Sequence, residues 1–174
     1  MTASSWRRRL VLIAGPLALA AAMIVYVTAQ SGPRPPELPL YTVTATGSQA
    51  MGGPAEQPST RLHLPRGAKR DARFEVDLRP ATAPQEKVVA YAFTFGASGG
   101  AAAEPAPLEA KIEIAPEGAV KLTGPVRTLE GVSEIRVVIG APEAIGKFDD
   151  AASRAREGTS EPRVHVLKVP IDRD

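Results

Sequence analysis

The sequence contains no cysteine, which excludes disulfides, thiolate catalysis and cysteine-ligated zinc sites. Aromatic residues are also scarce, at 5% of the chain, whereas Val, Leu, Ile and Ala are plentiful. The core is therefore expected to be aliphatic, and its stability has to come from packing alone.

A surplus of one charge sign is missing from most of the chain, although the isoelectric point is about 9.1. Three of the 21 basic residues are Arg7, Arg8 and Arg9, and no acidic residue precedes Glu37. The remaining 18 basic residues face 19 acidic ones, which leaves the rest of the chain close to neutral. Nucleic acid is therefore not an expected partner, because phosphate binding requires clustered Lys and Arg side chains.

Residues 10–29, LVLIAGPLALAAAMIVYVTA, are twenty consecutive residues without a charge. As a helix they would extend roughly 30 Å, the thickness of the hydrocarbon core of a bilayer. The arginines at positions 7–9 predict that residues 1–9 form a cytoplasmic tail, and Trp6 and Tyr26 lie near the two ends, where interfacial aromatics are favoured. We predict a single transmembrane signal-anchor helix, with the lipid bilayer as its partner.

A cleaved signal peptide is the alternative for this segment, because Val27, Thr28 and Ala29 offer the small residues that signal peptidase prefers. The apolar run is longer than the usual ~7 to 15 residues of a signal peptide, which favours the uncleaved anchor. Residues 30–39 contain four prolines and predict an extended stalk. Residues 40–174 are then an extracytoplasmic domain.

Alternation of apolar and polar residues dominates this domain and is typical of antiparallel sheets with one solvated face. In RFEVDLR, the side chains of Phe74, Val76 and Leu78 are expected to face the core. The stretches LEAKIEI and EIRVVI repeat the pattern, with Leu108, Ala110, Ile112, Ile114, Ile135, Val137 and Ile139 inward, and weaker strands are expected at 40–46, 61–64, 87–95, 119–123 and 163–171. Eight short strands predict a mainly β fold, an antiparallel β-sandwich of immunoglobulin-like size.

Two local signals add detail to this sandwich. Pro116-Glu117-Gly118 predicts a turn that joins two strands as a hairpin. One short helix is predicted from Pro142, which suits a first turn, to Gly158, which suits a C-cap. Ile145, Phe148 and Ala152 would form its apolar stripe, and we expect it to cross one end of the sandwich; a surface loop is the alternative.

Gly96, Ser98 and Gly100 have the G-x-S-x-G spacing of a hydrolase nucleophile elbow. An elbow requires a helix after the serine, but AAAEPAPLEA contains two prolines and leads into another strand. We therefore predict that Ser98 lies in an exposed hairpin tip, with neither His63 nor His165 within hydrogen-bonding distance.

The other candidate site residues also have simpler interpretations. His63 and His165 are expected to be solvent-exposed on the polar faces of their strands, and no short-range spacing supports a metal site. Asp149 and Asp150 are adjacent in the predicted helix and diverge, so they are expected on its solvated surface and not in a Ca²⁺ or acid–base pair. No catalytic residue, cofactor or metal is expected.

The order of these parts resembles uncharacterised single-pass membrane-anchored proteins of GC-rich, myxobacteria-like bacteria. The resemblance is carried by the anchor, the stalk and the segments LPLYTVTATGSQAM, RFEVDLRP, IEIAPEGAVKLTG and EIRVVIGAPEAI. It implies a bacterial inner-membrane protein with its C-terminal domain in the periplasm, and a setting in envelope signalling.

The expected function is a membrane-tethered, non-enzymatic module that binds a protein or envelope component outside the cytoplasm. A structural envelope spacer or assembly factor is the alternative. A serine hydrolase that uses Ser98 is the third and least favoured hypothesis.

Overall fold

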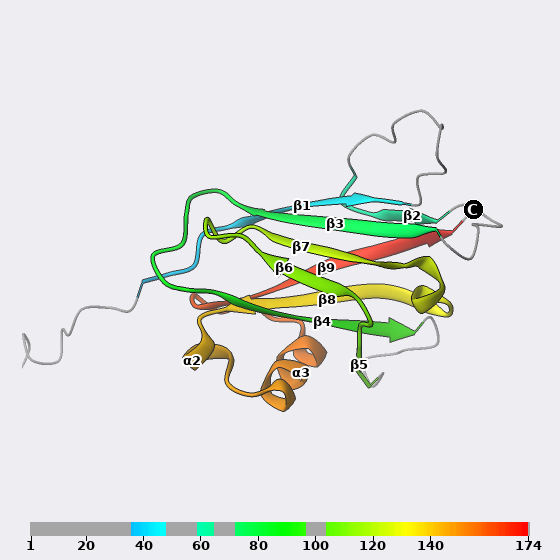
Figure 1. The fold of residues 1–174 in the computed structure, drawn as a ribbon. Helices are drawn as coiled ribbons and strands as arrows, with labels where there is room; N and C mark the ends of the chain where they lie inside the picture. The colour runs from blue at the N-terminus through cyan, green and yellow to red at the C-terminus, as the bar shows by residue number, and fades with distance from the viewer. Residues whose placement is uncertain (1–35, 48–58, 65–71, 97–103, 174) are drawn as a thin grey trace, which may run out of the picture. The chain divides into compact units, whose positions relative to one another are not determined.

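The computed structural model describes residues 36–47, 59–64, 72–96 and 104–173, which belong to one compact unit (Figure 1). Nine strands occur in this described part, and they form two sheets. The first sheet has the order β1 (Tyr41–Thr46), β3 (Arg73–Pro80), β7 (Val120–Pro125) and β6 (Lys111–Ile114). The second has the order β2 (Leu62–Leu64), β9 (Val164–Arg173), β8 (Val132–Gly140), β4 (Val89–Gly96) and β5 (Ala106–Pro107).

The predicted mainly β fold is confirmed, and all five of the weaker strand predictions correspond to observed strands. The expectation of wholly antiparallel sheets is wrong at one place, because β2 runs parallel to β9. In this orientation Leu62 and Leu64 are both buried in the core, and Arg61 forms an ion pair with Asp172 of β9 at 3.1 Å. Burial of two leucines outweighs the slightly poorer hydrogen bonding of a parallel pair.

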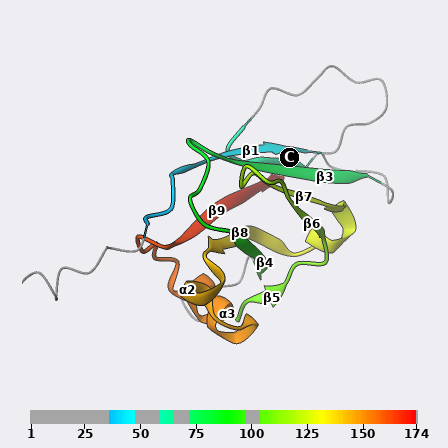
Figure 2. The same cartoon turned by 60° about the vertical axis from the view of Figure 1, so that its left-hand side comes forward.

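The two sheets contribute to one shared apolar cluster. In β3 the side chains of Phe74, Val76 and Leu78 are fully buried, as their alternation predicts. From the second sheet the cluster receives the inward residues of β8, again as predicted, together with Val169 and Ile171 of β9. In Figures 1 and 2, β1 and β3 of the first sheet lie on one side, and β8 and β4 of the second sheet lie on the other.

A second apolar cluster lies on the other face of the second sheet, although the alternation predicted sheets with one solvated face. There Phe93 and Phe95 of β4 and Val138 of β8 are buried under the helices α2 (Pro142–Ile145) and α3 (Phe148–Glu157). The predicted helical segment therefore covers a sheet face and does not cross an end of the two layers (Figure 2). The reason is that Phe93 and Phe95 alternate with Ala92, so that the larger apolar area of β4 faces outward and needs a cover.

Gly146 divides the predicted helix into its single first turn, α2, and the ten-residue α3. Its φ of 81° is left-handed and incompatible with a continuous helix. As predicted, Pro142 begins the first turn and Gly158 caps the C-terminus in the left-handed conformation. The predicted apolar stripe is largely confirmed, since Ile145 is buried, Ala152 packs against the second cluster and the Phe148 ring contacts that of Phe93 although it is 43% exposed. Ala151 and Ala155, which were not part of the predicted stripe, are fully buried as well.

Candidate interaction surface

The hairpin of β6 and β7 has the predicted turn at its tip. The amide of Ala115 donates to Ala119 O at 2.8 Å, and the amide of Gly118 donates to Ala115 O at 2.9 Å. Gly118 has φ 83°, as a three-residue hairpin loop with a glycine bulge requires. The hydroxyl of Tyr41 donates to Gly118 O at 3.2 Å, and burial raises the pKa of this phenol. Tyr41 of β1 thus holds the turn in place.

An open groove of about 670 Å³ lies beside this turn, on the face of the first sheet that turns away from the core. Its walls come from β3, β6 and β7 and from the segment 81–83 that follows β3. Apolar and charged groups alternate along it, and the charged residues are Asp77, Arg79, Glu113, Glu117 and Lys121. A second hollow of about 310 Å³ lies between the turn and residues 84–89.

Ile114 lines both hollows and is one of the few large apolar residues with an exposed side chain, at 39%. The alternation had assigned Ile114 to the core together with Leu108, which is indeed buried. The prediction for Ile114 is wrong because β6 is the edge strand of its sheet, so that no further strand covers this side chain. An apolar, partly exposed residue therefore marks the rim of each hollow.

The charged residues around the groove are already ordered. Lys111 forms an ion pair with Glu113 at 2.6 Å, and Lys121 forms one with Glu75 at 2.6 Å. The hydrogen bond from Lys111 lowers the pKa of Glu113, and the hydrogen bond to Glu75 raises the pKa of Lys121. The two ion pairs form an alternating pattern of charge on the surface.

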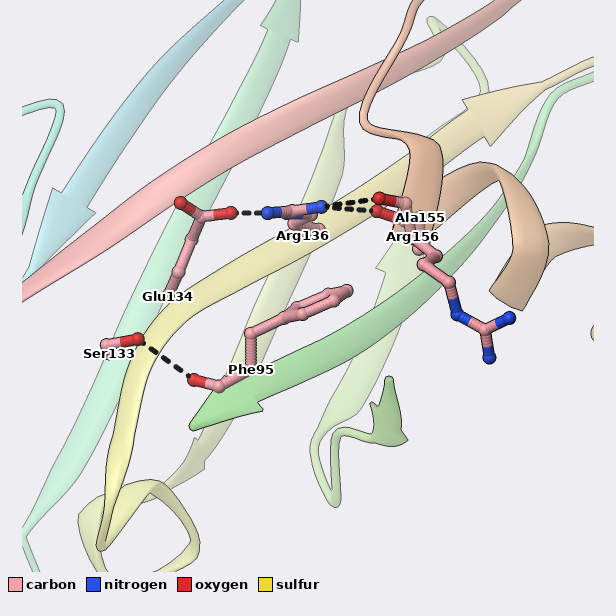
Figure 3. Close-up of polar contacts among 6 residues, drawn as sticks. All are labelled: Phe95, Ser133, Glu134, Arg136, Ala155 and Arg156. Carbon is pink, nitrogen blue, oxygen red and sulfur yellow. Dashed lines mark hydrogen bonds and ion pairs between the residues drawn. The ribbon is translucent and has the colours of Figure 1, made fainter. Parts of the chain in front are cut away.

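Arg136 of β8 is the most connected charged side chain on the opposite side of the molecule (Figure 3). Its Nε donates to Glu134, and its Nη1 donates to the carbonyl oxygens of Ala155 at 2.7 Å and Arg156 at 3.1 Å. These carbonyls belong to the last turn of α3, which has no further helical amides to bind. The Nε and Nη1 donors of Arg136 thus serve the fold, and we assign this residue a structural role.

Arg163 is a second structural arginine. Its Nη2 donates to Glu86, in the segment before β4, and to Glu143, in the first turn of α2, both at 2.7 Å. These bonds raise the pKa of the guanidinium. Arg163 therefore links two segments that are 57 residues apart in the sequence through one charged group.

The two histidines differ from one another: His63 lies between the buried Leu62 and Leu64 and faces away from the core, as predicted, whereas the prediction for His165 is wrong. His165 lies in the same alternation phase as Val169 and Ile171, which places it on the core side of β9 and not on the polar side. His165 is half-buried, and its ring is edge-on to that of Tyr41, with the two ring centroids 6.2 Å apart. Its Nε2 lies 3.4 Å from Leu38 O. His63, on β2, is half-buried as well. The error arose because β9 exposes no simple apolar–polar alternation when both of its faces are covered.

Asp149 and Asp150 are exposed, as predicted. Asp150 has a local role, since its Oδ2 accepts a hydrogen bond from the amide of Lys147 at 2.8 Å and so caps α3. Ser98 and the anchor residues Trp6, Arg7, Arg8, Arg9 and Tyr26 lie outside the described residues.

Within residues 36–47, 59–64, 72–96 and 104–173, no helix combines the length and the apolar character needed to cross a membrane. The same part of the chain contains no group of three or more His, Asp or Glu side chains placed to hold a metal ion. No family model, curated protein or solved structure matches the chain. The fold and the surface beside β6 are therefore the basis for any functional proposal.

Proposed function

We propose that the chain is a membrane-tethered extracytoplasmic interaction module that binds a protein or envelope component in the groove beside β6 and β7. The groove itself carries the proposal. Residues from three strands line the groove, and they offer apolar contacts together with charges of both signs. Polypeptide partners are recognised by this combination of apolar anchors and oriented polar groups.

The proposed architecture is a β-sandwich of immunoglobulin-like size held outside the membrane. The shared apolar cluster of the two sheets supports the sandwich. The uncharged residues 10–29 behind Arg7, Arg8 and Arg9 support a single-pass anchor, and the prolines of residues 30–39 support a stalk. In this arrangement the groove is available to partners in the space outside the cytoplasm.

The resemblance to membrane-anchored proteins of myxobacteria-like bacteria suggests the setting. It favours the bacterial inner membrane, with residues 40–174 in the periplasm and a role in envelope signalling. We assign the module no catalytic residue, cofactor or metal.

The tether is tested by measuring the mass and the topology of the protein in its membrane. The expected result is an intact chain whose domain is digested only by protease added on the periplasmic side. A mass that lacks residues 1–29 would indicate a cleaved signal peptide in place of the anchor. Protection of the domain from this protease would indicate the opposite topology.

The groove is tested by photo-crosslinking in intact membranes. A photoreactive amino acid is introduced at Thr82 or Glu117, both exposed at the groove, and at Glu157, exposed on α3, as the matched control. We expect a discrete crosslinked product from the two groove positions only. Products of equal yield from Glu157, or none from the groove, would contradict binding there.

A further inference from the structure

Among the strands that the structure describes, β6 is the outermost of its sheet and has one edge without a paired strand. Because Ala115 pairs with Ala119 through a hydrogen bond, the alternation of an antiparallel ladder makes Glu113–Lys121 and Lys111–Thr123 the next hydrogen-bonded pairs. The backbone N–H and C=O groups of Ile112 and Ile114 then point away from β7. In the described part of the chain β6 pairs with no other strand. Such an edge is a template for a further strand.

The charges of β6 indicate which strand fits. Lys111 and Glu113 flank Ile112 symmetrically with opposite charge, and their side chains are 72% and 52% exposed. If a second β6 adds antiparallel with the two Ile112 residues opposite one another, each Lys111 lies opposite Glu113 of the other copy. We propose that two copies of this chain associate in this way, through β6, about a two-fold axis at Ile112.

The alternative registers are disfavoured by the same charges. Moving the axis by one residue to Glu113 places two glutamates opposite one another. Moving it to Lys111 places two lysines opposite one another and Glu113 opposite Glu109 of the other copy. Like charges directly opposite in a sheet are destabilising, whereas opposite charges stabilise it. The charges around Ile112 thus favour this register over the two registers in which the axis is displaced by one residue.

The favoured register also continues the charge pattern of the first sheet. Within one copy, Asp77 of β3 lies opposite Lys121 of β7, which lies opposite Glu113 of β6. In the favoured register the next residue in this row is Lys111 of the other copy. The signs of the charges therefore alternate across the boundary between the two β6 strands, which we call the seam. Joining the two sheets gives one continuous sheet of eight strands, four from each copy.

The core-facing side of the seam is apolar. In this register the two Ile112 side chains lie opposite one another, and Ile114 lies opposite Ala110 of the other copy. Ile114, which is 39% exposed in the single chain, thereby gains a neighbouring strand. The seam is short, so the association is weaker than that of a standard interface. The inference does not depend on the proposed function, since it requires neither the membrane nor a partner in the groove.

Charge reversal tests the inference on the full chain, purified in detergent and analysed by sedimentation over a concentration series. Lys111→Glu and Glu113→Lys each bring like charges together twice at the seam, so each is expected to weaken self-association about tenfold. The double variant K111E/E113K restores opposite charges and is expected to associate like the wild type. An equimolar mixture of the two single variants is expected to form heterodimers.

Cysteine crosslinking tests the register, and the absence of natural cysteines makes each introduced thiol unique. Facing residues of a non-hydrogen-bonded pair have Cα atoms about 4.5 Å apart, which suits a disulfide. A mixture of K111C and E113C is therefore expected to crosslink on oxidation, whereas K111C alone is not. A wild-type chain that stays monomeric up to ~1 mM, a self-association that ignores the charge reversals, or equal crosslinking by K111C alone would overturn the proposal.

Discussion

The guanidinium carbon of Arg136 lies 4.1 Å from the centre of the Phe95 ring, so that the cation covers the face of the aromatic side chain. The same guanidinium binds the carbonyls at the C-terminus of α3 (Figure 3). A positive charge at this end of a helix is favourable, because the last carbonyls carry partial negative charge. One side chain thus joins the second sheet to the helix that covers it.

Replacement of Arg136 by Ala is expected to lower the free energy of unfolding by about 2 kcal/mol, since it removes a cation–π contact and two bonds to helix-terminal carbonyls. Urea unfolding of the full chain measures this loss. Arg127→Ala, on the exposed face of the 3-10 helix η1 (Val126–Leu129), is the control and is expected to change stability by less than about 0.5 kcal/mol. Equal effects of the two substitutions would show that Arg136 does not join sheet and helix.

Replacement of Phe93 by Ala is expected to cost about 3 to 5 kcal/mol, because its side chain is fully buried beneath α3. Phe148→Ala is the matched control. Its ring packs 5.2 Å from that of Phe93 but is 43% exposed, so we expect a loss of roughly 1 kcal/mol. Denaturant unfolding compares the two variants. A small loss for Phe93→Ala would mean that the helices do not cover this face of the sheet.

Replacement of Gly146 by Ala is expected to destabilise the protein, although alanine is the better helix former. Gly146 has φ 81°, and a Cβ there would lie 2.5 Å from Asp150 Oδ2, the atom that caps α3. Gly131→Ala separates the strain of a positive φ from the steric clash of the added Cβ. Gly131 has φ 74°, but no atom lies within 4 Å of a Cβ added there. Thermal or urea unfolding should give about 1 kcal/mol for G131A and roughly 2 kcal/mol or more for G146A. A stabilised G146A variant would instead indicate one continuous helix.

The Glu143 carboxylate is expected to make stability depend on pH. Its pKa is lowered by a hydrogen bond from its own backbone amide and by the bond from Arg163. A lowered pKa in the folded state stabilises the fold above the unfolded value of 4.5, and this contribution is lost as the pH falls through the folded pKa.

Glu143→Gln is therefore expected to be slightly less stable than wild type at neutral pH and to match it in acid. The effect is small because the group is exposed, and it should decrease further in ~1 M salt. Urea midpoints measured from about pH 3 to 7 provide the comparison. A difference that persists unchanged in acid would assign the effect of the substitution to packing and not to charge.

The strands of the first sheet and the hairpin turn could be predicted because local signals suffice for them. In β3 the apolar residues alternate with charged ones, so only one face can be buried. The Pro116-Glu117-Gly118 turn has a glycine where the loop requires positive φ. The second sheet was less predictable, because a strand with both faces covered has no polar face that would reveal its phase.

The candidate surface was not predicted at all. Ile114 has the same local pattern as Phe74, yet one is exposed at an edge and the other is fully buried. A signal for the covered outer face was present in the alternation of Phe93 and Phe95 with the smaller Ala92 and Thr94, which indicates that the larger apolar face of β4 needs a neighbour. Strand order, by contrast, leaves no local trace.

The sequence by itself determined which segments of this chain become strands, where the hairpin turns and where the helix is capped, because these depend on alternation, glycine conformation and proline geometry within a few residues. Only the tertiary structure decided which strands are neighbours, and hence that Arg136 binds a helix terminus while β6 is the outermost described strand of its sheet and lies between two hollows. Those outcomes depend on which apolar faces bury the most area against one another, a property of residues far apart in the sequence.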